Sequence, residues 1–292
     1  MKIRFLPRPP TSEVPFAIGV PALIWQFLFF YIPLLLIVVS SFLKFSLSGE
    51  IEGLTLEKIL PFFSPLYLRV IGNSLLLALG NAILCLLIGY PFAYFLAFRG
   101  KRFKSLFLFL LIVPFWTNFL LHVYAWFFVL EKQGFLNILL TNLGIIDEPL
   151  HMLNSLFAIM VMMVYYYLPF MILPLYSTLE RFNYKLIEAS YDLGGSWLQT
   201  FRHIILPLSL RGMRAGFFLV FIPSFGEFAI PELMGGDKLM FVGSVVSHYI
   251  LGEDTGELGA AFTVVASLFL IISAALLYFL INRLFGSRRA HA

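Results

Sequence analysis

The sequence predicts an all-α integral membrane protein, and three observations support this fold class. Apolar residues make up 60% of the 292-residue chain and charged residues only 12%, whereas about 25% of the residues of a soluble domain are charged. The mean hydropathy is +0.92. Uncharged apolar runs recur along nearly the whole length, each long enough for the roughly 20 residues that a helix needs to cross the hydrocarbon layer. A soluble globular chain is therefore excluded.

Six transmembrane helices account for these runs. The first run is uncharged and much longer than the apolar core of about 7 to 15 residues in a cleavable signal peptide, so we expect a retained helix, bent at Pro21 and Pro33. The composition does not change along the chain, which predicts one membrane domain, 15–282, between the tails 1–14 and 283–292. Residues 44–69 and 233–257 read as polar loops. The predicted helices cover residues 15–43, 70–98, 105–130, 153–178, 208–232 and 258–281.

The distribution of lysine and arginine predicts that both termini lie in the cytoplasm. Fifteen of the 20 basic residues fall in the two tails and in the segments 99–104 and 181–214, and cytoplasmic segments of membrane proteins carry such an excess. The net charge of +4 records this orientation, so no nucleic-acid partner is expected. The outer loops are acidic, which favours the arrival of a cation or of a basic patch on a soluble partner, unless these acids serve only to solvate the loops.

Residues 188–207, EASYDLGGSWLQTFRHIILP, are too polar to span a bilayer but amphipathic. Four apolar residues recur at helical spacing, so the segment needs a surface to lie against. Gly194 and Gly195 interrupt it and predict a turn between two short helices, and Pro207 suits the first turn of the next membrane helix. An interfacial helix on lipid headgroups is the alternative. The four apolar residues are Leu193, Trp197, Phe201 and Ile204.

The same segment resembles the EAA signature of ABC importer permeases. Glu188, Ala189 and Ser190 stand at the triplet, Gly194 at the glycine, and Ile204, Leu206 and Pro207 at the end; Ser190 departs from the usual alanine. The resemblance implies a type I ABC importer permease fold in which the loop at about 180–207 docks, as a coupling helix, into a separate ATPase subunit. It also implies a bacterial inner-membrane protein with two such ATP-binding subunits, a second homologous permease subunit and a periplasmic or surface-tethered binding protein.

Further stretches within about 66–282 resemble the permeases for putrescine and spermidine. The resemblance implies import of a polyamine, although related branches of the family carry other small solutes. The stretches are GYPFAYFLA at 89–97, LFLLIVPFWTN at 108–118, LPFMILPLYSTLER at 168–181 and GEFAIPELMGG at 226–236.

Two kinds of residue are candidates for the substrate path. Glu227 lies between Pro223 and Pro231 in a run otherwise free of charge, and an acid at membrane depth usually faces a cavity or a partner. Aromatic rings bind alkylammonium groups through cation–π attraction. Glu227 could instead be a surface acid, and the rings could serve only packing. The aromatic candidates are Trp116, Tyr124 and Trp126, together with the run Tyr165, Tyr166 and Tyr167, of which Tyr166 is preferred.

Other functions find little support in the sequence. A phosphate-binding loop of the Walker type is absent, so ATP and Mg²⁺ are expected in a partner subunit and no cofactor in this chain. The five histidines lack metal-ligand spacing, and Cys85 is the single cysteine. An ion-coupled secondary carrier would share the composition but gives no reason for the EAA-like loop. A membrane-embedded enzyme would need a clustered catalytic constellation.

Overall fold

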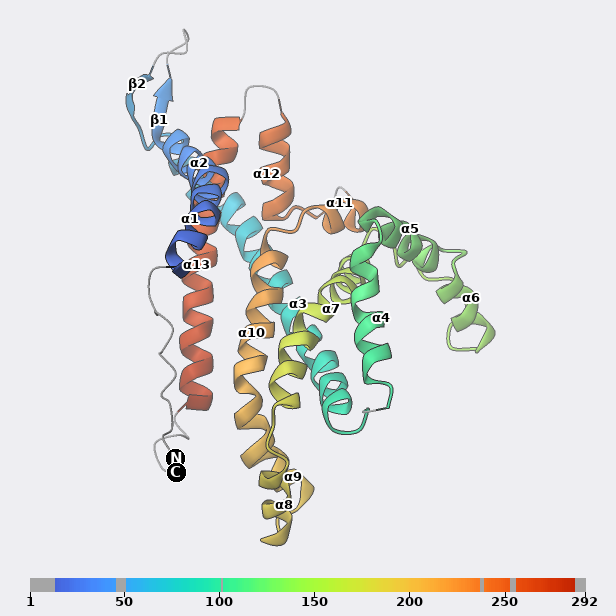
Figure 1. Cartoon of the computed structure of the whole chain (residues 1–292). Helices are drawn as coiled ribbons and strands as arrows, with labels where there is room; N and C mark the ends of the chain where they lie inside the picture. Colours follow the sequence, from blue (N-terminus) through green and yellow to red (C-terminus); the bar gives the residue numbers. More distant parts are fainter. Residues whose placement is uncertain (1–13, 46–50, 101, 237–238, 253–255, 287–292) are drawn as a thin grey trace, which may run out of the picture. The chain divides into compact units, whose positions relative to one another are not determined.

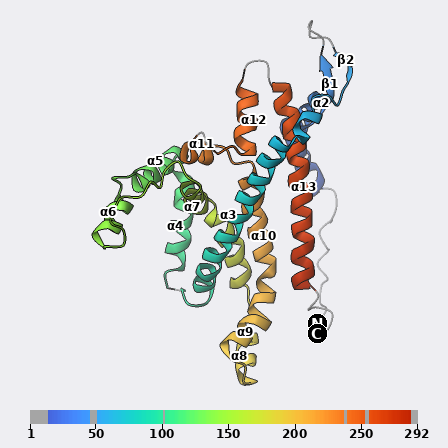
Figure 2. The same cartoon turned by 180° about the vertical axis from the view of Figure 1, so that it is seen from behind.

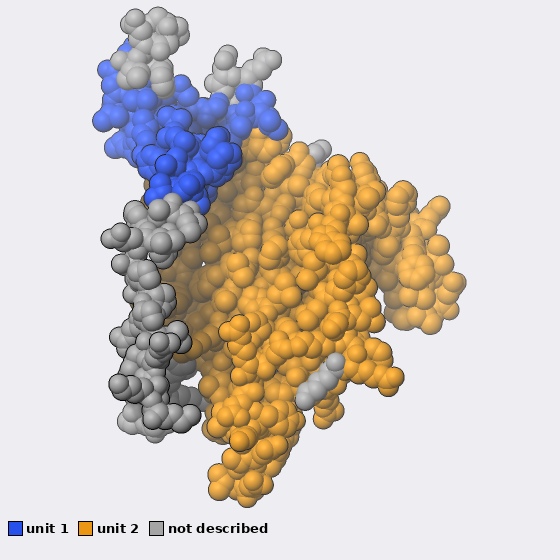
Figure 3. Space-filling model, in the orientation of Figure 1, with its two compact units in different colours: residues 1–62, 249–265 blue, residues 63–248, 266–292 orange. Residues whose placement is uncertain are grey.

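The computed structural model describes residues 14–45, 51–100, 102–236, 239–252 and 256–286. The chain forms two compact units, residues 1–62 with 249–265 and residues 63–248 with 266–292, which Figure 3 colours separately. Most of the predicted tails, 1–14 and 283–292, lies outside the described residues.

Helices dominate the structure, as predicted. Within the described ranges, five helices are long and apolar enough to cross a membrane, and a sixth span results if one bent pair of helices counts as one. This confirms the predicted all-α membrane fold. The five are Gly19–Phe42, Pro65–Phe98, Leu156–Glu180, Trp197–Phe225 and Gly256–Arg283, and the bent pair is Lys104–Trp116 with Phe119–Asn142.

The first span in unit 1 contains a π-helical turn. Helix α1 (Val14–Gln26) continues through η1 (Phe27–Tyr31) into α2 (Ile32–Phe42). Pro33 lies just after the π turn, and proline has no N–H to offer the helical ladder, so the hydrogen bonds shift there. None of the apolar window of this span is buried within the chain, which fits a surface that faces lipid or another membrane protein.

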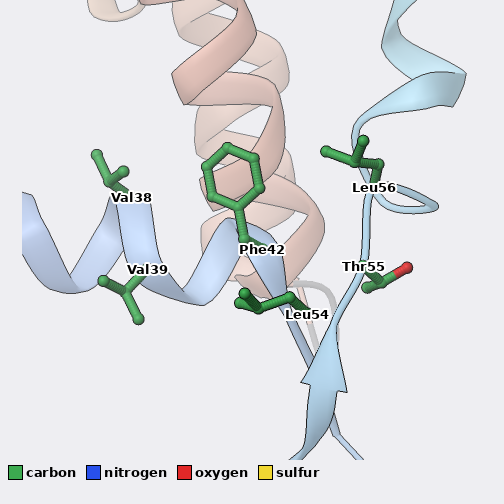
Figure 4. A pocket seen from close by; sticks show the side chains of 6 residues that line it. All are labelled: Val38, Val39, Phe42, Leu54, Thr55 and Leu56. Carbon is green, nitrogen blue, oxygen red and sulfur yellow. The ribbon is translucent and has the colours of Figure 1, made fainter.

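An unpredicted β-hairpin follows this span. Strands β1 (Leu43–Phe45) and β2 (Ile51–Leu54) pair antiparallel, with Leu43 opposite Leu54 and a bulge after Lys44. Within unit 1 the side chain of Lys58 forms an ion pair with Glu257 and donates a hydrogen bond to the Leu43 carbonyl (2.5 Å). An apolar hollow of about 460 Å³ lies between the span and the hairpin (Figure 4); it is lined by Val38, Val39, Phe42, Leu54, Thr55 and Leu56.

The core of unit 2 is a packed trio of helices, α3 (Pro65–Phe98), α7 (Leu156–Glu180) and α10 (Leu206–Phe225). Cys85 is fully buried in it, as expected for a small core side chain. The amide of Asn81 donates to the hydroxyl of Ser224 (2.8 Å), which links α3 to α10. Such a buried polar pair satisfies both groups where no water reaches them.

Two glycines let α10 approach α7 closely. A Cβ at Gly212 would lie 2.6 Å from Thr178 Oγ1 and 2.7 Å from the Pro174 carbonyl oxygen, and one at Gly216 would lie 2.8 Å from Met171 Sδ. Gly212 and Gly216 are four residues apart and share one helix face, the arrangement that permits close helix contact in membranes.

The predicted third helix, 105–130, is wrong as a single rod. Helix α4 (Lys104–Trp116) ends at Trp116, and α5 (Phe119–Leu130) starts after a bend of 102°. The side chain of Asn118 caps α5 by accepting a hydrogen bond from the Leu120 N–H (2.8 Å). Asparagine is a favoured N-cap residue, which explains why a new helix begins at this point. A short helix, α6 (Phe135–Asn142), follows α5.

The predicted fifth helix, 208–232, ends early. Helix α10 stops at Phe225, and a turn at Gly226–Phe228 leads to α11 (Ala229–Gly235). The predicted loop 233–257 contains α12 (Val242–Leu251), and α13 (Gly256–Gly286) completes the fold. A Cβ at Gly243 would lie 2.7 Å from the Glu227 carbonyl oxygen, so glycine lets the start of α12 pack directly on the turn.

Candidate coupling segment and substrate path

The segment that resembles the EAA signature forms one short helix, the predicted glycine turn and then the start of a long helix, so the expectation of a second short helix is wrong. Helix α8 (Lys185–Asp192) ends before Gly194, whose φ of +77° is in the left-handed region, and α9 (Trp197–Thr200) follows. The space around Gly194 is open, so it is the backbone conformation, and not a steric contact, that requires glycine there. The tight packing is at Gly195, where a Cβ would lie 2.7 Å from the Ser190 carbonyl oxygen.

Side-chain hydrogen bonds fix the angle between the two helices. The hydroxyls of Ser190 and Thr200 lie 2.9 Å apart and connect α8 to α9. Ser196 and Gln199 form a capping box at the start of α9, in which each side chain satisfies a backbone N–H of the other residue. A serine at position 190, where the EAA signature usually has alanine, therefore contributes a bond between the helices.

Helix α9 continues without a break through the π-helical turn η3 (Phe201–Ile205) into α10. Pro207 is in the first turn of α10, as predicted, and the π turn precedes it as η1 precedes Pro33. The rings of Phe201 and Trp197 are stacked with centroids 5.5 Å apart, and Phe201 meets Tyr90 of α3 edge-on at 5.8 Å.

The outer surface of this segment exposes large apolar side chains among its polar ones. Leu193 is 89% exposed, and the signature residues Glu188 and Ala189 are exposed as well, whereas Ile204, Leu206 and Pro207 are half-buried. Helix α8 and the glycine turn lie outside the candidate membrane spans, and exposed apolar side chains there favour a docking surface over a free one. The exposed apolar and aromatic residues of the segment are Tyr184, Leu186, Tyr191, Leu193, Trp197 and Leu198.

Glu227 lies in the turn between α10 and α11, where three hydrogen bonds hold its carboxylate. Oε1 accepts from the backbone N–H groups of Ala229 (3.1 Å) and Ile230 (3.3 Å), and Oε2 accepts from the hydroxyl of Tyr167 on α7 (2.7 Å). The carboxylate thus caps the first turn of α11. Its side chain is half-buried, while Tyr167 is buried. The charge is held in place and still reachable.

Aromatic rings continue from Glu227 toward the break between α4 and α5. The Tyr166 ring packs against Tyr167 (5.4 Å), Phe119 (5.3 Å) and Phe115 (5.8 Å). Tyr166 is thus one ring away from the residue that binds the carboxylate.

The other predicted aromatic residues lie farther from this cluster. Trp126 packs on Tyr165 (5.6 Å), whose hydroxyl donates to His122 Nδ1 (2.8 Å). His122 Nε2 in turn donates to the Pro114 carbonyl (3.0 Å), a structural role at the end of α4. Trp116 and Tyr124 are 75% and 57% exposed, and among the described residues neither ring packs against the cluster around Tyr166.

Tyr167 is one of the aromatic candidates predicted from the sequence, where Tyr166 is preferred to it. Three consecutive tyrosines on one helix point in different directions, and only the position of α10 and α11 selects Tyr167 as the partner of Glu227.

Helices α7 and α10 connect the two sites. Tyr167 lies within α7 and Glu227 just beyond the end of α10, while α8 follows the other end of α7 and α9 leads into α10. Helices α8 and α9 lie at the end of α10 opposite to α11 (Figure 1), and the reverse view agrees (Figure 2). Because a helix rises about 1.5 Å per residue, Tyr167 lies about 20 Å from the end of α7 that leads to α8.

Comparison with known proteins assigns the chain to a family. Residues 89–291 match the family described as the binding-protein-dependent transport system inner membrane component. The chain belongs to this family. It is the multi-pass inner-membrane permease component of an ABC importer that works with a binding protein, and a partner ATPase hydrolyses the ATP. The predicted resemblance to ABC importer permeases is confirmed.

Several curated relatives are similar to this permease over most of their length. It is 41% identical over 253 residues to the spermidine/putrescine transport system permease protein PotB of Escherichia coli K12, covering 85% of this chain and 92% of that protein. The identity to PotB of Salmonella typhimurium is 40% over 267 residues, with 90% and 93% covered. The PotB of Haemophilus influenzae is 39% identical over 260 residues, with 89% and 90% covered.

Solved structures of a bacterial ABC transporter share the fold of the permease. One is described as involved in import of the acidic polysaccharide alginate; it gives a TM-score of 0.64 at 16% identity and covers 96% of both chains. The other is a complex with an alginate pentasaccharide-bound periplasmic protein; it gives 0.64 at 18% identity and covers 94% of both chains. These similarities confirm the ABC importer permease fold.

Proposed function

We propose that this permease carries a polyamine, putrescine or spermidine, and that Glu227 admits the cation. The observation that carries the proposal is the carboxylate of Glu227, half-buried, held by Tyr167 and flanked by the rings around Tyr166. A polyamine has ammonium groups separated by methylene chains, and a carboxylate with neighbouring ring faces suits both parts. The similarity to the spermidine/putrescine permeases supports the same solute.

The arrangement of hydrogen bonds suggests how the cation acts. The phenol of Tyr167 donates to Glu227 Oε2, and an ammonium group is a stronger donor for a carboxylate than a phenol. An arriving ammonium would compete for Oε2 and release Tyr167, while Oε1 would stay on the α11 backbone. The hydrogen bond that links α7 to the turn after α10 would then be present without substrate and broken when substrate binds.

The same two helices would transmit ATPase motion. The exposed apolar side chains of α8 and α9 form the surface that we assign to an ATPase subunit, with Glu188, Ala189, Ser190 and Gly194 shaping α8 and its turn. Ile204, Leu206 and Pro207 would carry the motion into α10. We further propose two ATPase subunits, a second homologous permease subunit and cytoplasmic termini, in keeping with the excess of basic residues on the α8–α9 side.

The test is ATP-driven uptake in vesicles that contain the assembled transporter. Glu227→Gln keeps the shape of the side chain and removes its charge, so uptake of putrescine at limiting concentration should fall about tenfold or more while complex assembly is unchanged. Glu232→Gln is the matched control, because Glu232 is an exposed acid on α11 without a side-chain hydrogen bond among the described residues. Equal uptake by Glu227→Gln and wild type would contradict the assigned role, and transport of uncharged solutes alone would contradict the substrate.

A further inference from the structure

A second hollow, with a partly polar lining, lies in unit 2, away from Glu227. It has a volume of about 400 Å³ and lies between the α8 end of α7 and the first turns of α10. Two arginines contribute to its walls, Arg181 directly after the last residue of α7 and Arg211 on α10. The residues that line it are Ser177, Thr178, Arg181, Leu208 and Arg211. Nothing in the proposed transport path uses these residues.

Helical spacing and a glycine contact bring the lining residues together. Ser177 and Arg181 are four residues apart and share one face at the end of α7, while Leu208 and Arg211 are three apart on α10. The helices meet where Gly212 approaches Thr178, because a Cβ at Gly212 would lie 2.6 Å from Thr178 Oγ1. Gly212, next to Arg211, therefore sets the separation of the two walls.

Within the described part of the chain, neither guanidinium makes an ion pair or a side-chain hydrogen bond. Glu180 is adjacent to Arg181 in sequence, but its carboxylate forms an ion pair with Lys104. The Thr178 hydroxyl donates to the Pro174 carbonyl (2.9 Å), whereas the exposed Ser177 hydroxyl has no such bond in the described ranges. The hollow thus offers two guanidinium groups and a hydroxyl as donors.

This donor set suits a phosphate group. Arginine presents paired N–H groups that match two phosphate oxygens, and two arginines on facing walls can hold one phosphate between them. A metal cation is excluded here, because the hollow contains no carboxylate and carries two positive charges.

We propose that this hollow, formed by Ser177, Arg181 and Arg211, binds a phosphate group and thereby ties α7 to α10. The phosphate could belong to a lipid headgroup or to a soluble phosphate. Because α7 and α10 lead directly to α8 and α9, the bound phosphate would stiffen the base of the coupling segment. That consequence depends on the role proposed for α8 and α9, but the binding itself does not.

Binding can be measured on the assembled, detergent-purified transporter in two arms. One arm titrates fluorescent phosphatidylglycerol, with a phosphate-free glycolipid carrying the same label as its reference. The other titrates inorganic phosphate by calorimetry. Phosphatidylglycerol binding with no response to millimolar phosphate identifies the lipid headgroup, whereas saturable phosphate binding identifies the soluble source.

The variants Arg181→Gln and Arg211→Gln should each weaken binding about fivefold, and the double variant more, since each basic residue near a phosphate contributes about a fivefold factor. Arg283→Gln removes an exposed arginine of α13 outside the hollow and should bind like wild type. Should the double variant fail to assemble, Arg181→Lys with Arg211→Lys keeps the charge but loses paired donation, and weaker binding is again expected.

Two results would overturn the proposal. The first is equal affinity of wild type, the arginine variants and Arg283→Gln in both arms. The second is unchanged binding together with loss of a partner subunit from the arginine variants, which would mean that a protein carboxylate fills the hollow.

Discussion

The hydroxyl of Tyr167 donates a 2.7 Å hydrogen bond to Oε2 of Glu227 and thereby joins α7 to the turn between α10 and α11. This bond links elements that also lead to the coupling segment. The acceptor, the Glu227 carboxylate, is negatively charged and attracts cations. The donor, Tyr167, is buried against neighbouring rings. If a substrate cation breaks this hydrogen bond, α7 and α10 can shift relative to each other, and the shift can reach α8 and α9 at their other end.

Tyr167→Phe removes the bond and keeps the ring. We expect the free energy of unfolding to fall by about 0.5 to 2 kcal/mol, the range for interhelical hydrogen bonds in membranes, and substrate-stimulated ATPase activity to lose part of its dependence on the polyamine. Thermal unfolding in detergent and ATPase assays on matched preparations measure the two effects. Tyr278→Phe, on α13, serves as a control for loss of a tyrosine hydroxyl. Wild-type behaviour in both assays would show that the bond is incidental.

Substitutions in the coupling turn should separate backbone strain from packing. Gly194→Asn should be tolerated better than Gly194→Val, because asparagine adopts positive φ readily and a β-branched residue pays at least 1–2 kcal/mol, as an order of magnitude. Gly195→Ala should impair the turn through its clash with Ser190. Co-purification of the ATPase at equal permease expression reports the outcome. Equal recovery with valine and asparagine at position 194 would contradict the backbone argument.

Close packing of α10 on α7 predicts a large effect of one added methyl group. A Cβ at Gly212 meets a backbone carbonyl as well as a hydroxyl, so Gly212→Ala should destabilise unit 2 by about 1–3 kcal/mol, as overpacking does. Gly72→Ala is the matched control on α3, where a Cβ would meet nothing within 4 Å. Thermal unfolding compares the two variants, and equal midpoints would show that α10 can shift at no cost.

The proposed orientation predicts which loops are labelled from outside the cell. Single cysteines at Glu52 and Asp147 should react with an impermeant reagent in intact cells, and one at Gln199 should react only after permeabilisation. Cys85 is buried and should contribute little background. Labelling of Gln199 from outside would remove the basis for docking to an ATPase.

Much of the fold could be predicted because hydropathy and helix-breaking residues act locally. The long apolar runs become spans, and the glycine pair at 194–195 becomes the predicted turn. The bend after Trp116 also had a local signal, since Pro114 precedes it and Asn118 caps the next helix. The sequence stays free of charged residues across the bend, however, and therefore predicts one helix over residues 105–130.

What could not be predicted depends on contacts between distant segments. The partner of Glu227 is sixty residues away in sequence, and nothing local distinguishes Tyr167 from its two neighbours. Likewise, Gly212 and Gly216 reveal their role only when α7 lies against them. The early end of α10 follows from the capping of α11 by Glu227 and from the packing of Gly243 on the same turn.

The central claim is that a cation at Glu227 is sensed by the ATPase through α7 and α10. The most direct measurement is the ATPase rate of the reconstituted transporter, with empty and with putrescine-loaded binding protein, for wild type and Glu227→Gln. We predict the same basal rate for both proteins and a strong reduction of the stimulation by loaded binding protein in the variant. Full stimulation of Glu227→Gln at limiting putrescine would contradict the claim.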